Sequence, residues 1–442
     1  MNKILLLIIG VLFVNIANSQ TARTFSLAEA VSFGVENHKE MAIAKNELQR
    51  AKEQMVEATS MGLPQLNAGV DYNYFIQLPT SLIPAQFINP MAADDEFLEV
   101  SFGTKNNLTA SATLSSLLFD GTYLVALKAS KKYIDFAKIN YENSQTNLRN
   151  SIKKAYLPPL LLDQNIKTIQ KNIVVLEKLL HETSEMYKSG FVEKMDVDKL
   201  ELTVDNMRVL KKDLEKNSQL ALDALKIQMG FPLEDEIELS ETIENLAREL
   251  DEEILTIKLD YGSRTEFNVL KYSEELSKLN VDRYKRGYWP SLSGFVNYQQ
   301  VIQGNNLFTN SISTPTSIAG LALKVPIFDG LYKKSKIQQA KLDLNNVQIQ
   351  KDLLKSGIDF QLKASRENYI NALETIKSRK KNLELAELIF STVQTKYKEG
   401  VGSSLEIIQS EQSLHQSQQN YLNALYDFII AKLDVEIALG RK

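Results

Sequence analysis

The 442-residue chain has no cysteine, only three histidines and a single tryptophan. Without cysteine it cannot form a disulfide scaffold, an all-cysteine zinc site, an iron–sulfur centre or a thiol nucleophile, nor carry a lipid on an N-terminal cysteine. His38, His181 and His415 lie far apart and lack the paired spacing of metal ligands. No Ser/His/Asp set or phosphate-binding loop occurs either. We therefore predict no metal site, no cofactor and no catalytic residue, and we do not expect an enzyme.

An excess of charge of one sign is also lacking. The 51 lysine and arginine residues are balanced by 55 aspartate and glutamate residues, which gives a formal net charge of -4. Proteins that bind nucleic acid concentrate positive charge, so no nucleic-acid partner is predicted. Beyond residue 20, no segment approaches 18 uninterrupted apolar residues, and a transmembrane helix is not predicted.

The N-terminus has the pattern of a secretory signal peptide. Lys3 supplies a positive charge, an apolar run extends from Ile4 to Val14, and small residues occupy the cleavage-site positions at Ala17 and Ser19. The apolar run is too short to span a bilayer as a helix. We predict a signal peptide over residues 1–19 and export from the cytoplasm.

The chain contains an internal duplication. The sequence Leu118-Phe119-Asp120-Gly121 recurs as Ile327-Phe328-Asp329-Gly330, 209 residues later, and Tyr187-Lys188-Ser189-Gly190 recurs as Tyr397-Lys398-Glu399-Gly400, 210 residues later. Internal repeats of this kind indicate two copies of one structural unit. The sequence predicts a first repeat over residues 20–230, an equatorial linker element over 231–262 and a second repeat over 263–442. The first copy has about 17 extra residues before Phe119, and we expect Leu78–Thr104 to form a longer loop.

Each copy carries two long segments of strong helix formers, with apolar residues that step by three and four. We predict antiparallel helical hairpins that reverse at Gly190 and Gly400, with Asp120 and Asp329 capping the first helix of each. The predicted long helices span about 122–186, 193–230, 331–396 and 403–439. Pro158 and Pro159 interrupt the first of them and predict a kink or two abutting helices, because proline lacks the backbone donor. Their role in function stays open at this point.

Four segments show the two-residue alternation of strands, at about 66–77, 107–119, 291–303 and 317–328. One face is apolar and the other is mostly small or uncharged, although the third segment alternates less cleanly. Such strands suit a half-buried soluble sheet or an outer-membrane barrel, and the lumen-like polar face favours the barrel. Four strands cannot close a barrel alone, and open edges are costly in lipid, so several chains are expected to contribute.

The sequence resembles the TolC-type outer-membrane efflux protein family over nearly all of the mature chain. The resemblance is carried by short motifs in a fixed order: Leu27-Ala28-Glu29-Ala30, Glu36-Asn37-His38, Pro64-Gln65-Leu66, Ser263-Arg264-Thr265-Glu266, Val325-Pro326-Ile327-Phe328-Asp329-Gly330, the two Tyr-Lys-x-Gly turns and Leu439-Gly440. It implies a mainly α fold with a membrane β-barrel portion, in which a homotrimer forms a 12-stranded β-barrel on a 12-helix periplasmic α-barrel.

The resemblance also implies functional residues at the hairpin turns. A periplasmic aperture is expected at Asp196, Tyr397, Glu406 and Gln409. Docking turns for a periplasmic adaptor are expected at Gly190, Phe191, Val192, Gly400, Val401, Gly402 and Ser403. A basic residue that latches the turn in some members is replaced here by Gly402. Two interpretations of Glu406 and Asp196 stay open: they are gate residues, or they are ordinary solvated carboxylates near a helix start.

The expected function is an outer-membrane exit duct of a tripartite efflux or secretion system. It would conduct small molecules or ions passively from an inner-membrane transporter and a periplasmic adaptor to the outside. The expected location is the outer membrane of a Gram-negative bacterium, in contact with its lipid and extending into the periplasm. A periplasmic adaptor with long hairpins and a secreted helical enzyme are the alternatives. The sequence names neither the substrate nor the class of pump.

Overall fold

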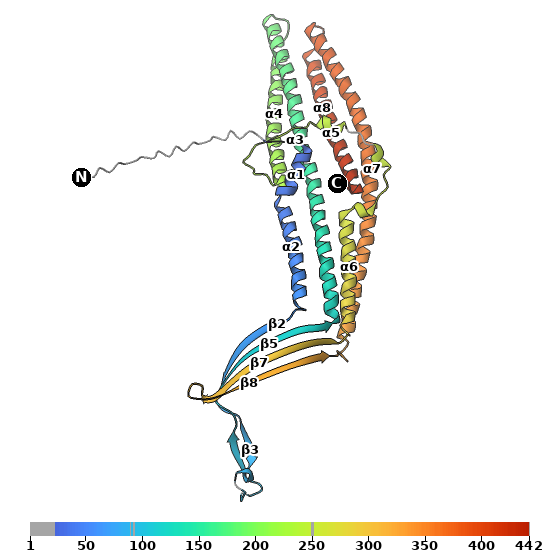
Figure 1. The fold of residues 1–442 in the computed structure, drawn as a ribbon. Helices are drawn as coiled ribbons and strands as arrows, with labels where there is room; N and C mark the ends of the chain where they lie inside the picture. The colour runs from blue at the N-terminus through green and yellow to red at the C-terminus, as the bar shows by residue number, and fades with distance from the viewer. Residues whose placement is uncertain (1–22, 89, 92, 249–251, 442) are drawn as a thin grey trace, which may run out of the picture. The chain divides into compact units, whose positions relative to one another are not determined.

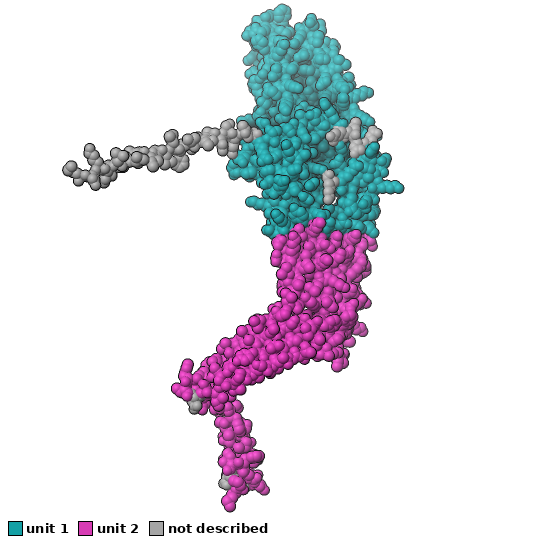
Figure 2. All heavy atoms as spheres, in the orientation of Figure 1, with its two compact units in different colours: residues 1–46, 139–268, 353–442 teal, residues 47–138, 269–352 magenta. Residues whose placement is uncertain are grey.

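The structure of the protein is a computed structural model that describes residues 23–88, 90–91, 93–248 and 252–441. The predicted signal peptide, residues 1–19, lies outside the described residues. The chain is mostly helical (Figure 1) and divides into two units, coloured in Figure 2. Unit 1 comprises the described residues of Met1–Asn46, Ile139–Asn268 and Leu353–Lys442, and unit 2 comprises Glu47–Lys138 and Val269–Asp352.

The two copies of the duplication carry the same series of main elements. In the first copy these are α2 (Lys39–Ser60), β2 (Gln65–Tyr74), β5 (Asn106–Asp120), α3 (Gly121–Lys188) and α4 (Lys194–Met229). In the second they are α6 (Thr265–Arg286), β7 (Ser291–Asn306), β8 (Asn310–Lys324), α7 (Tyr332–Lys398) and α8 (Ser404–Leu439). The smaller elements are β1 (Arg23–Phe25), α1 (Leu27–Asn37), β3 (Thr80–Pro84), η1 (Ala85–Phe87), β4 (Phe97–Ser101), β6 (Ile237–Leu239), α5 (Ile243–Ala247), η2 (Glu252–Leu255) and η3 (Tyr261–Ser263).

Unit 2 contains a four-stranded antiparallel sheet in the order β2-β5-β7-β8. The register aligns apolar residues across one face, as in the row Leu66, Leu114, Val296 and Ala319. The other face aligns small or polar residues, as in the row Gly69, Ser111, Gln299 and Thr316. The alternation read in the sequence therefore gives β2 and β5 one apolar and one polar face. Strands β7 and β8 are more mixed, since Phe295 and Ile318 lie on the polar face and Ser317 lies on the apolar face.

Two expectations for unit 2 need correction. The fourth strand spans Asn310–Lys324 and not 317–328. It ends early because its partner β7 begins at Ser291, directly after Pro290, and because Pro326 has no backbone N–H to donate. The segment Leu78–Thr104 is not a plain loop. It contains the two-stranded β3–β4 hairpin, in which Leu82 is paired with Glu99.

The first long helix begins at an aspartate cap, as predicted. The Asp120 carboxylate accepts hydrogen bonds from the backbone N–H groups of Thr122 and Tyr123 at 2.7 and 2.9 Å, which lowers the number of unpaired donors at the start of α3. Asp329 accepts a backbone bond from Lys333 at 3.1 Å at the start of α7.

Helix α3 is a single continuous helix, and the two-helix alternative at Pro158 and Pro159 is wrong. Its residues beside the prolines, Ile152, Tyr156 and Leu157, are buried in the core of unit 1. The Tyr156 hydroxyl also donates to the Phe25 carbonyl oxygen at 2.8 Å. Burial of these side chains offsets the backbone donors that the prolines lack, so the helix continues.

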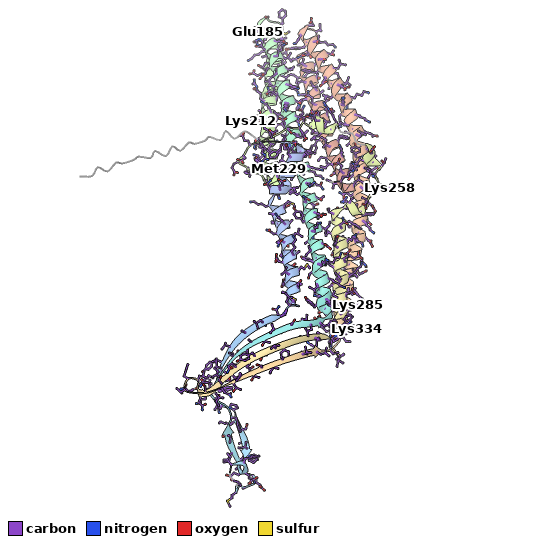
Figure 3. All side chains as sticks on the ribbon, viewed as in Figure 1. Glu185, Lys212, Met229, Lys258, Lys285 and Lys334 are labelled. Carbon is purple, nitrogen blue, oxygen red and sulfur yellow. The ribbon has the colours of Figure 1, made fainter. Side chains whose placement is uncertain are left out.

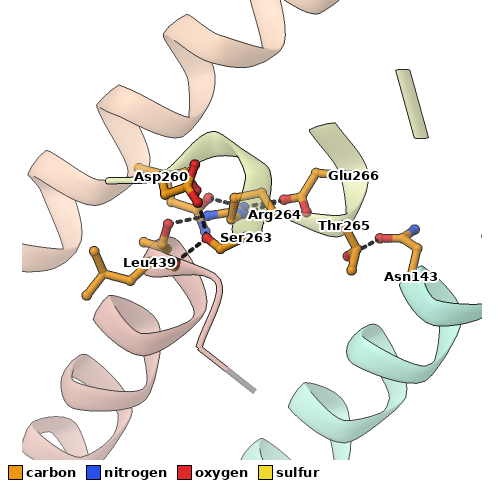
Figure 4. Close-up of polar contacts among 9 residues, drawn as sticks. Asn143, Asp260, Ser263, Arg264, Thr265, Glu266 and Leu439 are labelled. Carbon is orange, nitrogen blue, oxygen red and sulfur yellow. Dashed lines mark hydrogen bonds and ion pairs between the residues drawn. The ribbon is translucent and has the colours of Figure 1, made fainter. Parts of the chain in front are cut away.

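The first residues of the second copy form hydrogen bonds with the last residues of α8, within unit 1 (Figure 4). The buried Arg264 guanidinium donates to the Ala438 carbonyl oxygen at 2.7 Å and also pairs with Glu266. The Ser263 hydroxyl donates to the Leu439 carbonyl oxygen at 2.8 Å, and Thr265 donates to Asn143 at 2.8 Å. The bonds from Arg264 and Ser263 satisfy two of the last carbonyl groups of α8, which have no partner inside the helix.

Candidate functional site

The two long hairpins of unit 1 reverse at the glycines predicted from the sequence. Gly190 and Gly400 adopt positive φ angles of 80° and 73°, a conformation that glycine enters without strain. The Phe191 N–H donates to the Met186 carbonyl oxygen at 2.9 Å, and the Val401 N–H donates to the Lys396 carbonyl oxygen at 3.0 Å. Both turns thus end a long helix with the same Schellman hydrogen bonds.

The turn residues differ in how much of their side chains is exposed. Phe191 and Val401 are largely exposed, and Val192 is partly buried. Ser403 caps α8, because its hydroxyl accepts a bond from the Glu406 N–H at 3.2 Å. Glu185, labelled near the end of α3 in Figure 3, pairs with Lys188 at 2.8 Å on the solvated side of the same turn.

Gly402, which occupies the place of the expected latch residue, packs closely against the end of α7. A Cβ atom built there would lie 3.0 Å from the Tyr397 backbone nitrogen and 3.2 Å from the Lys396 carbonyl carbon. Since both neighbours are backbone atoms, a side chain at this position would push the turn away from α7. The glycine therefore permits the close packing of turn and helix.

Polar contacts join the two hairpins near their turns. The Thr183 and Tyr397 hydroxyl groups, from α3 and α7, lie 3.1 Å apart. The Ser404 hydroxyl donates to the Asp196 carboxylate and so links α8 to α4. Lys398 forms an ion pair with Glu182 at 3.2 Å. Burial raises the pKa of the Tyr397 phenol, and the nearby Asp196 carboxylate acts in the same direction.

Apolar packing supports these contacts between the hairpins. Leu179, Leu200, Tyr397 and Ile407, one from each of the four long helices, form a buried cluster. Farther from the turns, the Asn172 amide donates to the Gln418 side-chain oxygen at 2.7 Å and provides another link between α3 and α8. The four helices therefore form one packed group at this end of unit 1.

The four expected aperture residues lie in two different environments. Asp196 and Tyr397 lie between the hairpins, where Asp196 also accepts a bond from the Glu193 N–H at 3.3 Å. Glu406 and Gln409 are exposed on the surface of α8. Asp196 and Tyr397 thus take part in the contacts between the hairpins, whereas the side chains of Glu406 and Gln409 are solvated.

Sequence reasoning missed several residues of this region. Thr183 was visible as a polar residue within the apolar seam of α3, but its partner Tyr397 could not be identified from one helix alone. Glu411 had no signal in the sequence, although it is only 2% exposed and neither carboxylate oxygen has a hydrogen-bond partner among the described residues. Burial raises the pKa of Glu411 to about 7.

A second surface with functional character lies in unit 2, where the strands meet the helices. The Arg286 guanidinium lies 3.8 Å from the centre of the Trp289 ring, and Lys333 lies 5.4 Å from the centre of the Tyr288 ring. Both aromatic rings are exposed. Lys285 and Lys334 lie at the same junction, at the end of the strands in Figure 3. Exposed aromatic rings beside basic side chains are typical of a membrane–water interface.

Among the described residues, no group of three or more His, Cys, Asp or Glu side chains is arranged to hold a metal ion. Within the same part of the chain, no helix has the length and apolar character needed to cross a membrane.

Comparison with known proteins shows which family the chain resembles. The outer membrane efflux protein family matches residues 35–230. The outer membrane protein TolC of Vibrio cholerae is 20% identical over 437 residues, which cover 94% of this chain and 90% of TolC. These matches support assignment of the chain to the outer membrane efflux protein family. Members of this family are efflux proteins, and the comparison gives no support to the periplasmic adaptor alternative.

Solved structures of outer membrane proteins and channels share the fold of this chain. The outer membrane protein VceC of Vibrio cholerae matches with a TM-score of 0.71 at 15% identity, covering 94% of this chain and 96% of VceC. The MtrE outer membrane channel of Neisseria gonorrhoeae matches with a TM-score of 0.71 at 13% identity, covering 94% of this chain and 88% of MtrE. The predicted TolC-like architecture is therefore confirmed at the level of the chain fold.

Proposed function

We propose that this protein is the outer-membrane exit duct of a tripartite efflux or secretion system. It conducts small molecules or ions passively from an inner-membrane transporter and a periplasmic adaptor to the outside of a Gram-negative cell. The family match supports an efflux role in the outer membrane, and it gives no reason to expect an enzyme. The division into a first repeat (20–230), an equatorial linker element (231–262) and a second repeat (263–442) is part of this proposal.

The observation that carries the proposal is the open sheet of unit 2. Among the described residues, β2 pairs only with β5 and β8 pairs only with β7, so each has an edge without a partner. Such edges are costly in lipid, where water cannot satisfy the backbone groups. Because all neighbouring strands are antiparallel, β2 and β8 run in opposite directions, and β8 of one copy can pair antiparallel with β2 of the next.

Closure of this sheet by further copies leads to a homotrimer. Three copies contribute 12 strands to one β-barrel, and their paired hairpins form a 12-helix α-barrel in the periplasm. The apolar face of the sheet meets outer-membrane lipid, and the polar face lines the lumen. The exposed Tyr288 and Trp289 beside Arg286 and Lys333 support an interface with lipid headgroups at the base of the strands.

The ends of the hairpins form the periplasmic aperture in this proposal. Asp196 and Tyr397 hold the hairpins together through Ser404 and Thr183, and opening requires these contacts to separate. Glu406 and Gln409 are exposed and free to line the narrow passage. Carboxylates in such a ring attract cations through the focused field of a confined passage.

The turns themselves are the proposed docking points for the adaptor. The docking residues are Gly190, Phe191, Val192, Gly400, Val401, Gly402 and Ser403. Phe191 and Val401 present apolar side chains to solvent at the tips of both hairpins, which supports contact with a partner protein. The adaptor in turn connects the duct to the inner-membrane transporter.

A planar-bilayer recording tests the function. Protein purified as heat-resistant trimers from the outer-membrane fraction is expected to give discrete conductance steps that cations added to the periplasmic side block. Glu406→Ala should weaken the block, whereas Glu215→Ala, which changes a solvated acid far from the turn, should leave it unchanged. Absence of trimers or of conductance steps would refute the duct, and unchanged block in Glu406→Ala would remove Glu406 from the aperture.

A further inference from the structure

The segment between β2 and β5 exposes an unusual number of apolar side chains. Ile76 is 90% exposed and Phe87 is 82% exposed, and Leu82, Phe97 and Phe102 are also exposed. The β3–β4 hairpin within this segment extends beyond the end of the sheet in Figure 1. A two-stranded hairpin is marginally stable alone in water, and large exposed apolar patches mark interaction sites. We therefore expect a partner to cover the apolar side chains of this segment.

The connection from the sheet to this hairpin forms an apolar neck, which consists of Phe75, Ile76 and Phe102. Backbone bonds fix it, since the Phe75 N–H donates to the Lys105 carbonyl oxygen at 2.8 Å and the Phe102 N–H donates to the Pro79 carbonyl oxygen at 3.2 Å. The neck thus continues the edge strand β2 in a defined geometry. All three of its side chains are exposed.

The turn between β7 and β8 exposes a complementary aromatic side chain. Phe308 is 97% exposed, and its backbone N–H donates to the Asn306 side-chain oxygen at 3.0 Å, which fixes the turn. The register places this turn at the same end of the sheet as the neck, because Tyr74 pairs with Asn106 and Asn106 pairs with Gly304. Phe308 and the neck therefore lie at the same end of the sheet.

Within one chain, however, the neck and Phe308 belong to opposite edges of the sheet. Strands β5 and β7 lie between them, and three strand spacings amount to about 14 Å. Pairing of β8 from one copy with β2 of the next makes these two strands neighbours, one spacing of ~5 Å apart, and brings the turn of one copy to the same end of the barrel as the neck of the next. The partner for the neck is then the β7–β8 turn of a neighbouring copy.

Charge favours a second copy of the chain over a lipid surface as this partner. The segment 75–105 carries four acidic residues, Asp94, Asp95, Glu96 and Glu99, and one basic residue, Lys105. These acids repel anionic lipid phosphates. The segment 304–318, which contains the turn, has no charged residue and so imposes no repulsion.

We propose that the neck and the β3–β4 hairpin form an intersubunit clamp, in which Phe308 of a second copy packs against Phe75, Ile76 and Phe102. The clamp rests on the proposed closure of the sheet between copies. It holds adjacent copies together at the end of the barrel away from the helices. The first copy of the duplication carries the hairpin, and the second copy supplies the turn that it holds.

The natural absence of cysteine makes disulfide crosslinking a direct test. The variant Ile76→Cys/Phe308→Cys, oxidised in outer membranes, should give crosslinked dimers and trimers. A reducing agent should cleave the disulfides and return these species to single chains. Chains with different tags, one carrying Ile76→Cys and the other Phe308→Cys, should crosslink only to each other. The matched control Ile76→Cys/Leu321→Cys places the second cysteine near the opposite end of β8 and should give no crosslink.

The outcomes separate the clamp from the duct itself. Stable trimers without a crosslink between Ile76→Cys and Phe308→Cys would overturn the clamp and leave the proposed function standing. Loss of trimers in the unsubstituted protein would overturn both.

Trimer stability provides a second measurement that does not depend on crosslinking. Phe308→Ala should lower the temperature at which trimers dissociate by several degrees, and Thr309→Ala should not. Ile76→Ala/Phe308→Ala should dissociate no more easily than the weaker of the two single variants, because both remove the same contact. Fully additive shifts would overturn the contact.

Discussion

At the scale of single residues, Glu411 is the most unusual side chain of the hairpins. It lies on α8, is almost fully buried, and its two carboxylate oxygens have no hydrogen-bond partner among the described residues. Burial raises its pKa from 4.5 to about 7, because the charged form cannot be solvated. Between these two values the folded chain holds a proton that the unfolded chain releases. The contribution of Glu411 to stability is therefore largest below pH 4.5 and is lost as the pH rises to 7.

This linkage predicts a pH-dependent effect of Glu411→Gln. At pH 8 the variant should be more stable than the unsubstituted protein, by up to about 3 kcal/mol, because glutamine carries no charge into the buried site. At pH 5 the two proteins should differ little. Urea unfolding followed by circular dichroism at both pH values measures the difference. Glu406→Gln, at an exposed site on the same helix, should show no such change, and an equal effect of Glu411→Gln at both pH values would contradict the linkage.

At the scale of elements, the long helices end in the same way. Gly190, Gly230, Gly400 and Gly440 all have positive φ angles, and each is followed by the N–H of the Schellman bond. Repetition of this cap explains why the helix ends could be read from the sequence. The contacts between hairpins, in contrast, join residues about 214 positions apart and have no local signature.

The Thr183–Tyr397 contact is expected to couple the two hairpins. Thr183→Val and Tyr397→Phe remove one hydroxyl group each and keep the shape of the side chain. Each should cost about 1 kcal/mol of stability, and the double variant should cost little more than one single variant, because both remove the same hydrogen bond. Chemical unfolding of all four proteins gives the coupling energy.

Tyr187→Phe is the matched control for this cycle. Tyr187 occupies the equivalent position on α3 but is exposed, so its substitution should change the stability by less than Tyr397→Phe. If the contact also holds the aperture closed, Tyr397→Phe should lengthen the open periods in bilayer recordings. Strictly additive unfolding energies for Thr183→Val and Tyr397→Phe would show that the two hydroxyl groups do not interact.

At the scale of the whole molecule, the two faces of the sheet determine how the protein meets the membrane. Ala112 lies on the apolar face, between Ala68 and Tyr298, and its neighbour Ser111 lies on the polar face. Ala112→Lys should reduce the yield of outer-membrane trimers, since a lysine facing lipid near the midplane costs about 2–4 kcal/mol.

Ser111→Lys tests the opposite face with the same side chain. It should permit assembly and lower the cation preference of the conductance, because its charge enters the lumen. Membrane fractionation and bilayer recording of the two variants distinguish the faces. Equal yields for both would contradict the assignment of the apolar face to lipid.

The sequence alone indicated most of the elements but not all of their limits. The long helices, Gly190 and Gly400 could be found because the helical periodicity and the glycine stops are local features. The β3–β4 hairpin was missed because its five-residue strands mix polar and apolar residues and are too short to show clean alternation. Pro158 and Pro159 suggested a break, but burial of Ile152, Tyr156 and Leu157 in the core keeps α3 continuous.

By itself, the sequence determined what depends on neighbouring residues: the duplication, the helices and their glycine ends, the two faces of each strand, and the absence of any cysteine chemistry. Only the tertiary structure decided what depends on distant segments. It pairs Thr183 with Tyr397 and Asp196 with Ser404, buries Glu411 and, among the described residues, leaves one edge of β2 and one edge of β8 without a partner. The physical reason is that periodicity fixes the conformation of a segment, whereas contacts between segments arise only when the hairpins and strands pack together.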